Sequence, residues 1–228
     1  MILGIYSDLH CNKPALDSML SVVGNIDQWI SLGDSVGLYP QINEVLDWQY
    51  KNNVIYVRGD HEFALLKNKK ILGSFTGTDS IKKNAEIISP KNFNYLSHLK
   101  NKIDLEYDNI KICLNHFLSS KSKTIKYKKQ IDLLELEKIY SDYDFVFFGH
   151  THLPAVIYGC NTIFINPGSA GFPIDVERRC SIIVFNTKTG IFNFIRYDYD
   201  TNKLIKIINN FNYNPKLIKY IRNGHKWI

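Results

Sequence analysis

The first 62 residues alternate between apolar segments and helical patterns. The apolar segments are residues 1–7, 26–34 and 53–59. Continuous apolar runs of this length are typical of buried parallel strands. One helical pattern opens at Pro14 and stops at Gly24, and another covers residues 42–51. The alternation predicts a parallel sheet flanked by helices, which is an α/β fold.

The rest of the chain predicts more helices and then many short strands. Helical patterns run from residue 63 to 99, with predicted breaks near 73–80 and at Pro90. Residues 102–115 predict a hairpin that turns at Asp108 and Asn109. An amphipathic helix is predicted over 131–140, followed by strands at 144–150, 155–159, 162–166, 181–187 and 191–197 and a last helix over 215–222. We expect one domain, residues 1–228, built on two sheets.

The composition of the sequence bears on the cellular location of the protein. No apolar run approaches the about 18 residues of a membrane span, and the first residues lack the basic region of a secretory signal. The four cysteines show no paired spacing: they are Cys11, Cys113, Cys160 and Cys180. Unpaired cysteines indicate reduced thiols rather than disulfides or a structural zinc site. We therefore expect a cytoplasmic protein without a membrane partner.

Positive charge is concentrated after residue 62. The net charge is +6, of which the first 62 residues carry −5 and the remainder +11. The densest basic run lies between Lys121 and Lys129. Such a run attracts phosphorylated substrates or nucleic acid. The alternative is a solvated surface in a chain of lysine-rich composition.

Polar clusters that contain carboxylates and imidazoles follow the predicted strands. They are Asp8 with His10, Asp34, Asp60 with His61 and Glu62, Asn115 with His116, and His150 with His152. The carboxyl ends of strands in an open α/β sheet deliver their loops to one crevice. Mixed carboxylate and imidazole ligands suit divalent Mn, Fe, Ni, Co or Zn. The clusters therefore predict a metal site.

A site for two metal ions needs a carboxylate that bridges them. Asp8 and His10 lie two positions apart in a segment predicted to be extended, so both side chains face one side. His150 and His152 repeat this spacing, and Asp34 is the predicted bridge. Taken singly, each residue is also compatible with an ordinary turn or cap. Five of the seven histidines fall in these clusters, and only His98 and His225 lie outside.

The ordered motifs D-x-H, G-D, G-D-H-E, N-H and G-H-T-H resemble those of the calcineurin-like metallophosphoesterase superfamily. Longer stretches, among them LGDSVGLYPQINEVLDW, GHTHLP and FINPGSAGFPID, resemble a bacterial and archaeal branch of small phosphoesterases. The resemblance implies a four-layer α/β/β/α sandwich of two mixed sheets. It also implies two divalent transition-metal ions, with manganese favoured, one held by Asp8, His10, Asp34 and His152 and the other by Asp34, Asp60, His116 and His150.

By the same resemblance the chain hydrolyses a phosphate mono- or diester, of a nucleotide or another small phosphorylated molecule. A hydroxide on the metals would attack phosphorus in line. The implied catalytic residues are Asp34 and His61, the latter as a general acid or a cationic stabiliser of the leaving oxygen. Asn12, Asp60 and His61 are the implied substrate contacts, and Glu62 is expected to position the loop or His61. The Gly-rich turn at 166–171 either contacts phosphate or is structural.

Three departures from the family pattern qualify this prediction. Asp60 stands where the family has Asn, and its carboxylate binds metal but cannot donate an N–H to phosphate. Cys11 replaces a usual Gly and is either a thiol near the metal or a small residue that fills a loop. No Arg follows the G-D-S-V-G motif, which argues against a phosphoprotein phosphatase. Two alternatives stay open: a scaffold that has lost catalysis, and a nuclease guided by the run from Lys121 to Lys129.

Overall fold

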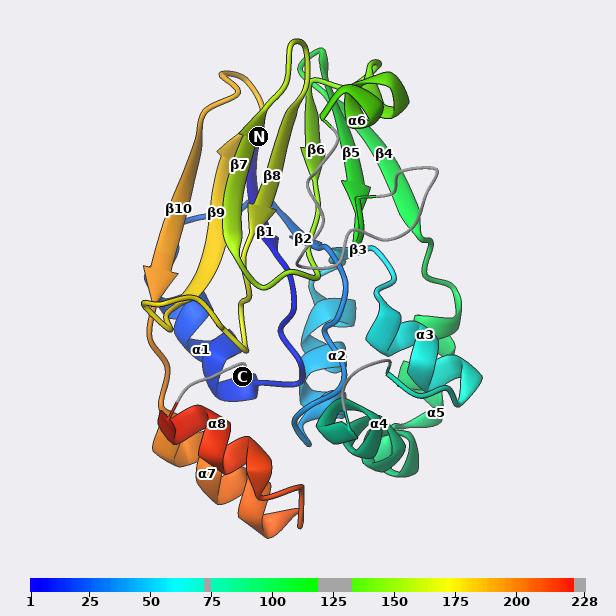
Figure 1. Ribbon diagram of the computed structural model, residues 1–228, viewed down its shortest axis with the longest axis vertical. Coiled ribbons are helices and arrows are strands. Elements are labelled where there is room, and N and C mark those ends of the chain that lie inside the picture. The colour runs from blue at the N-terminus through cyan, green and yellow to red at the C-terminus, as the bar shows by residue number, and fades with distance from the viewer. Residues whose placement is uncertain (72–74, 119–132, 224–228) are drawn as a thin grey trace.

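Two five-stranded sheets pack face to face in the computed structural model, which describes residues 1–71, 75–118 and 133–223 (Figure 1). The first sheet has the order β10-β9-β1-β2-β3. Its strands are β1 (Ile2–Tyr6), β2 (Gln28–Ser31), β3 (Ile55–Tyr56), β9 (Cys180–Asn186) and β10 (Phe192–Tyr197). The parallel strands β1, β2 and β3 confirm the sheet predicted from the first 62 residues. The added strands β9 and β10 are antiparallel and make the sheet mixed.

The second sheet has the order β4-β5-β6-β8-β7. Its strands are β4 (Lys102–Tyr107), β5 (Ile110–Asn115), β6 (Phe145–Phe147), β7 (Pro154–Tyr158) and β8 (Ile163–Pro167). β5, β6 and β8 are parallel, whereas β4 and β7 are antiparallel edge strands. The predicted hairpin turn is confirmed, because Asp108 and Asn109 have φ values of 51° and 65°. Asn and Asp tolerate these left-handed conformations.

The alternation of side chains along the strands builds the core between the sheets. Ile5 of β1 faces the second sheet, and Leu114 of β5 faces the first. Both lie in a buried cluster that also contains Phe147 and Phe185. Tyr6, one position later, lies in the outer cluster beneath the first helices. A period of two residues therefore gives each strand one face for the partner sheet and one for a helix.

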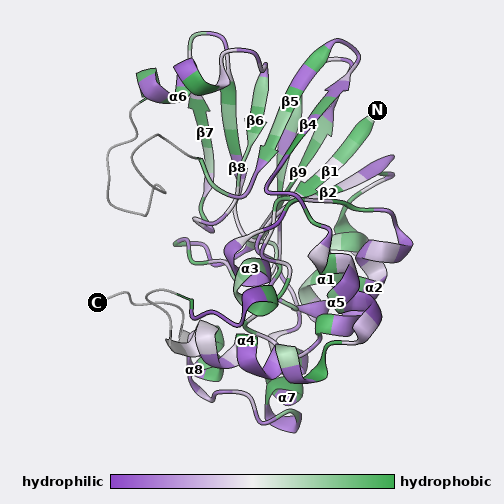
Figure 2. Cartoon of the chain, turned by 90° about the vertical axis from the view of Figure 1, so that its right-hand side faces the viewer, coloured by the Kyte–Doolittle hydropathy of each residue, from purple (hydrophilic) through white to green (hydrophobic). Residues whose placement is uncertain are grey.

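Helices cover the outer faces of both sheets. On the first sheet these are α1 (Lys13–Val22) and α2 (Ile42–Lys51), and α6 (Leu133–Tyr140) covers the second through Leu136 and Tyr140. Figure 2 shows hydrophobic strands in the sheets and helices that carry a hydrophilic side. The layers thus follow the predicted order α/β/β/α. No helix in the described ranges is long and apolar enough to cross a membrane.

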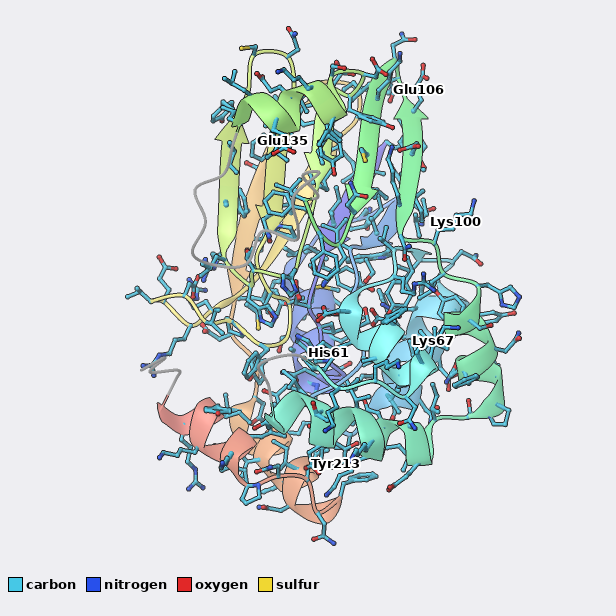
Figure 3. All side chains as sticks on the ribbon, turned by 45° about the vertical axis from the view of Figure 1, so that its right-hand side comes forward. His61, Lys67, Lys100, Glu106, Glu135 and Tyr213 are labelled. Atoms are coloured by element: carbon cyan, nitrogen blue, oxygen red, sulfur yellow. The ribbon has the colours of Figure 1, made fainter. Side chains whose placement is uncertain are left out.

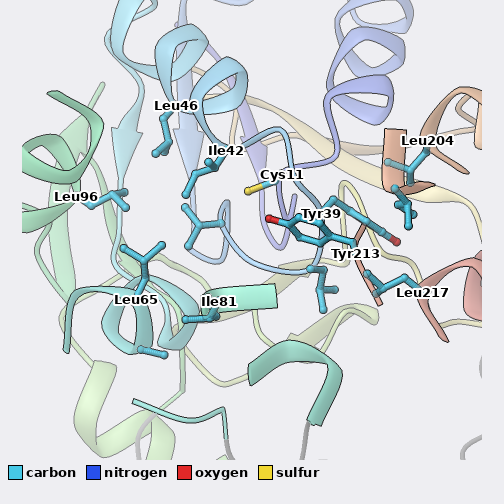
Figure 4. Packing of buried hydrophobic residues seen from close by; sticks show 14 of the residues in the cluster. Cys11, Tyr39, Ile42, Leu46, Leu65, Ile81, Leu96, Leu204, Tyr213 and Leu217 are labelled. Atoms are coloured by element: carbon cyan, nitrogen blue, oxygen red, sulfur yellow. The ribbon is translucent and has the colours of Figure 1, made fainter. Parts of the chain in front are cut away.

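The remaining helices gather beyond the carboxyl ends of the first sheet's parallel strands (Figure 1). They are α3 (Asp60–Lys67), α4 (Phe75–Ile87), α5 (Pro90–Ser97), α7 (Thr201–Asn210) and α8 (Lys216–Asn223). Their apolar faces meet around Tyr39 and Cys11, as Figure 4 shows. This helical layer forms a floor beneath the loops that follow the strands.

Two sequence predictions for this layer need correction. A break was expected near 73–80, and α3 ends at Lys67, but α4 already begins at Phe75, so the predicted break extends too far along the chain; residues 72–74 lie outside the described residues. Burial of Ser80 and Ile81 in the helical layer outweighs the weak helix propensity of this stretch. The second correction is α7, which the sequence analysis did not predict. Asp200 caps it by accepting a hydrogen bond from the Lys203 N–H.

Candidate metal centre

Eight carboxylate and imidazole side chains from five loops meet at the carboxyl ends of the central strands. They are Asp8 and His10 after β1, Asp34 after β2, Asp60 and His61 after β3, His116 after β5, and His150 and His152 after β6. Within the described ranges they form three overlapping groups, and the ligand atoms of each group lie within 4.8 Å of one another. All seven predicted ligands are therefore brought together.

The first group contains Asp34, Asp60, His116 and His150. Nε2 of His116 lies 3.3 Å from Oδ2 of Asp34 and 3.2 Å from Oδ1 of Asp60. Nδ1 of His150 lies 3.4 Å from the same Asp60 oxygen. Oδ1 of Asp60 therefore lies within 3.4 Å of both imidazoles, in the group of residues implied for the second ion.

The second group contains Asp8, His10 and His152. Nε2 of His152 lies 3.2 Å from Oδ1 of Asp8 and 3.2 Å from Nε2 of His10. The other oxygen of Asp8 accepts a hydrogen bond from the backbone N–H of His150. This bond links the loop after β1 to the loop after β6.

Asp34 connects the two groups. It forms the third group with His10 and His61, and its Oδ1 accepts the backbone N–H of His61 at 2.9 Å. The His61 ring lies 4.6 Å from the His10 ring, and its Nε2 is 3.9 Å from Oδ2 of Asp34. In Figure 3 His61 lies where the sheets meet the helical layer. Asp34 is therefore the carboxylate with access to both sets of ligands.

The backbone that presents these ligands differs from the prediction. Asp8 and His10 were expected in an extended segment, but their φ values are 55° and 52°. His150 and His152 have φ values of 66° and 58°, and Asp34 has 52°. Left-handed backbone is uncommon outside Gly, Asn and Asp and is found at functional sites that surrounding structure holds in place. The side chains converge because of these turns and not through strand alternation.

Backbone carbonyls orient three of the histidines. Nδ1 of His10 donates to the carbonyl of Val36 at 3.1 Å. Nδ1 of His116 donates to the carbonyl of Leu32 at 2.7 Å, and Nδ1 of His152 donates to the carbonyl of Phe172 at 2.8 Å. A carbonyl can only accept, so each Nδ1 carries the proton and each Nε2 faces the centre. Metal-binding histidines are held in the same manner. None of these carbonyl partners was predicted, because they come from residues with no chemical signature.

The donor set fits divalent cations. The Nε2 atoms of His10 and His152 lie 3.2 Å apart although both Nδ1 positions are already donors. Two imidazole lone pairs held this close repel each other unless a proton or a metal ion lies between them. Buried carboxylates complete the set, since Asp8 and Asp34 are at most 2% exposed. Oxygen and imidazole nitrogen ligands of this kind suit Mn, Fe, Co, Ni or Zn.

In the first group the carboxylates and the imidazoles stabilise each other's charged forms, whereas the two carboxylates oppose each other's ionisation. Burial raises the pKa of Asp34, and the nearby charge of Asp60 raises it further. Burial also acts to raise the pKa of Asp60, but hydrogen bonds from His116 and His150 outweigh it and hold that pKa below its usual range. Burial would lower the pKa of His116, but Asp34 and Asp60 raise it above the ordinary value. The group therefore favours positive charge at its centre.

The second group has the same character. Burial acts to raise the pKa of Asp8, but the charge of His152 outweighs it and lowers that pKa. Burial would lower the pKa of His152, but Asp8 raises it. Burial also lowers the pKa of His10, helped by His61 and His152, and it lowers the pKa of His61 to about 4.

Glu62 holds the loops of the site together, as expected for a positioning residue. Its fully buried carboxylate accepts the backbone N–H groups of Asp34, Val36 and Gly59 at 2.9, 3.1 and 2.8 Å. It also accepts the hydroxyl of Tyr56 at 2.5 Å. Tyr56 was not predicted as a functional residue, because it lies in β3 and has the pattern of an ordinary core residue. Four hydrogen bonds to one carboxylate fix the loops after β2 and β3 relative to each other.

The substrate-binding role predicted for Asn12 is not supported by this geometry. Its side chain is fully buried, and its Oδ1 accepts the N–H of Ala15 while its Nδ2 donates to the carbonyl of Gly171. The Gly-rich turn makes structural contacts with the loop after β1: Ser169 donates its hydroxyl to the carbonyl of Asp8, and the Ala170 N–H donates to the carbonyl of Ser7. Cys11 is fully buried, and burial raises the pKa of its thiol. These three features shape the floor of the site.

The chain is similar in sequence and in fold to known proteins. Residues 1–190 match the family model described as the calcineurin-like phosphoesterase superfamily domain. An uncharacterised protein of Methanocaldococcus jannaschii is 27% identical over 92% of this chain and 93% of its own length. A metallophosphoesterase from Sphaerobacter thermophilus has the same fold, with a TM-score of 0.82 at 22% identity and 99% coverage of both chains. A hypothetical protein from Pyrococcus horikoshii gives 0.82 at 19% identity, again with 99% coverage of both.

Proposed function

The chain belongs to the calcineurin-like phosphoesterase superfamily, and on that premise we propose that it hydrolyses phosphate esters with two divalent metal ions. The observation that carries the proposal is the convergence of buried carboxylates and imidazoles on one centre, with their electron-rich atoms facing inward. A scaffold that had lost its chemistry would not be expected to keep every histidine in place. We also propose a cytoplasmic location.

The residues divide into two overlapping ligand sets. Asp8, His10 and His152 would hold one ion with Asp34, and Asp34 would share the second with Asp60, His116 and His150. We propose manganese or another borderline divalent ion, because the sets combine carboxylate oxygen with imidazole nitrogen. When bound, such ions act as Lewis acids toward water and toward phosphate oxygens.

Residues around the proposed ligands would hold them in place and assist the leaving group. Phe172 packs against His10 and His152, with ring centroids 6.1 and 5.7 Å apart. Phe117 packs against His116 at 4.6 Å. These rings limit the motion of the ligands and exclude water from their sides. His61 lies beside Asp34 but is not one of the proposed metal ligands. We propose that it donates a proton or a hydrogen bond to the leaving oxygen.

Asp60 sets the charge of the centre. Three carboxylates, Asp8, Asp34 and Asp60, face the site, whereas the family pattern with Asn would leave two. An additional negative charge strengthens cation binding and weakens the attraction for an anionic phosphate. We therefore propose that this chain binds its metals more tightly, and phosphate less tightly, than its Asp60→Asn variant.

The proposal is tested with metal-free protein, a panel of divalent ions, and chromogenic phosphate mono- and diesters. We expect turnover with at least one ion, and a loss of about a hundredfold or more in Asp34→Asn. The matched control is Asp142→Asn, an exposed position outside the centre, which should retain wild-type turnover. Metal binding without turnover for any ester would overturn the proposal and favour the scaffold.

The nuclease alternative rests on the run from Lys121 to Lys129, which lies outside the described residues. In the same assay, oligonucleotide cleavage that falls steeply with salt would support it. A flat salt response together with turnover of small esters would support the small-molecule substrate.

A further inference from the structure

A cavity of about 500 Å³ opens beside the metal centre, at Gly59 and Asp60. Its walls come from the loop after β3, the start of α3, the start of β4, the loop after β5, and α6. Small-molecule sites occupy roughly 300–1,000 Å³ and combine apolar walls with a few placed polar groups. The cavity was not predictable from the sequence, because its residues come from four segments that are far apart in the chain.

Arg58 lines this cavity, and its guanidinium is oriented so that it could bind an anion. Its Nε and Nη2 donate to Oδ1 of Asn101 at 2.9 and 2.7 Å, and its Cζ lies 5.8 Å from the Phe63 ring centroid. No carboxylate pairs with it among the residues that the structure describes. A guanidinium has five N–H donors, so three are left for a ligand. An oriented guanidinium of this kind recognises phosphate or carboxylate.

The second cation on the wall is already engaged. Lys102 donates to the hydroxyl of Tyr143 at 2.6 Å and pairs with Asp104 at 3.2 Å. We therefore assign recognition of an anionic group to Arg58 and not to Lys102. Arg58 lies two positions before the proposed metal ligand Asp60, and both residues line the cavity. A phosphate bound by Arg58 would therefore lie close to a second phosphate at the metal centre, as in a ligand with two linked phosphates.

Two aromatic rings complete the wall. Phe63 lines the cavity and is 44% exposed, so its ring is accessible to a ligand that enters the cavity. Phe117 packs edge to face against both His116 and His150 at 4.6 Å, so it lies between the metal centre and the cavity. Rings in these places suit contact with a planar aromatic group of the substrate.

We propose that the substrate is a nucleotide with two linked phosphates, whose base lies against Phe63 and Phe117 and whose inner phosphate pairs with Arg58. This inference rests on the proposed phosphoesterase function. The outer phosphate would lie at the metal centre. Water oxygen bonds to the outer phosphorus and the bridging P–O bond breaks. The bridging oxygen leaves with the nucleotide, its charge balanced by the proton that water loses, so a nucleoside diphosphate yields a monophosphate and inorganic phosphate.

Calorimetric titration of the metal-loaded protein tests the proposal through binding. The probes are α,β-methylene adenosine diphosphate, which carries base and two phosphorus groups, and methylenediphosphonate, which lacks the nucleoside. We expect the nucleotide analogue to bind about tenfold more tightly, because stacking on aromatic rings contributes about 1–3 kcal/mol per base. Equal affinity for both probes would overturn the proposal.

Variants assign the contacts. Arg58→Gln should weaken the nucleotide analogue about tenfold, as expected for one hydrogen bond to a charged group, and Phe63→Ala should weaken it without affecting methylenediphosphonate. The control Lys206→Met removes a positive charge from an exposed position on α7 and should change neither affinity. An unchanged affinity in Arg58→Gln would refute the anion contact. Thermal unfolding of each variant shows that the chain is folded.

Turnover separates this inference from the proposed function. Hydrolysis of p-nitrophenyl phosphate without preference for the nucleotide analogue in binding would remove the cavity's role and leave the phosphoesterase in place. Selective nucleotide binding without hydrolysis of any ester would support the cavity and reject the proposed function.

Discussion

We predict that Glu62→Gln destabilises the metal-free protein by about 2–4 kcal/mol, because a carboxylate that accepts four hydrogen bonds becomes an amide that cannot accept all of them. In the folded protein one oxygen accepts the N–H groups of Asp34 and Gly59, and the other accepts the N–H of Val36 and the hydroxyl of Tyr56. The amide nitrogen must replace one of these oxygens.

The two orientations of the amide have different costs. With the nitrogen toward Asp34 and Gly59, two backbone N–H groups face a donor and both are left unpaired. With the nitrogen toward Tyr56, the hydroxyl oxygen can accept, and only the Val36 N–H is left unpaired. One buried donor without a partner costs about 1–3 kcal/mol, and the remaining bonds weaken because their acceptor is no longer charged. The second orientation sets the predicted magnitude.

Urea unfolding followed by circular dichroism measures the effect as a change in the free energy of unfolding. Tyr56→Phe removes a single donor of the same carboxylate and should cost about 1 kcal/mol. Glu106→Gln, at an exposed position of β4 (Figure 3), should remain within about 0.5 kcal/mol of wild type. A Glu62→Gln variant that also remains within this range would refute the reasoning, since the carboxylate would then hold no loop in place.

Three further predictions address the site and the core. Asp60→Asn should weaken metal binding about tenfold or more in competition with a chelator, while inhibition by inorganic phosphate becomes stronger; unchanged values for both would remove the charge argument. Gly33→Ala should lower both stability and metal content, because φ is +106° and a Cβ would lie 2.5 Å from Nδ1 of His116; wild-type metal content by mass spectrometry would contradict this. Leu114→Ala, fully buried between the sheets, should cost about 2–5 kcal/mol in urea unfolding, and a cost below 1 kcal/mol would show that the inter-sheet core is loosely packed.

The strands and helices around the centre were predictable because hydrophobic periodicity reports burial directly. The run at residues 42–51 has the bounds of α2, and the segment at 1–7 contains β1. α7 was missed because Asp200 and the apolar residues after it lie in a lysine- and asparagine-rich tail whose composition hides the pattern. The expected extent of one domain, residues 1–228, stays a prediction.

The candidate site was predictable at the level of side chains and not of backbone. Residue types and their order along the chain indicated which carboxylates and imidazoles would meet. The left-handed turns at Asp8 and His10 were not predictable, because tertiary contacts impose them against local preference. The carbonyl of Leu32 that orients His116 lies 84 positions away in sequence, and no local pattern marks it. Arg58 and its cavity escaped detection for the same reason.

The most direct test of the account is the number of divalent ions bound per chain, measured by elemental mass spectrometry after reconstitution of metal-free protein with manganese and removal of free ions. We predict two ions per chain in the wild type and a loss of about one in His152→Ala, which removes a ligand of a single set. Retention of no ion by the wild type, or equal retention by both proteins, would contradict the claim that these side chains form a two-metal centre.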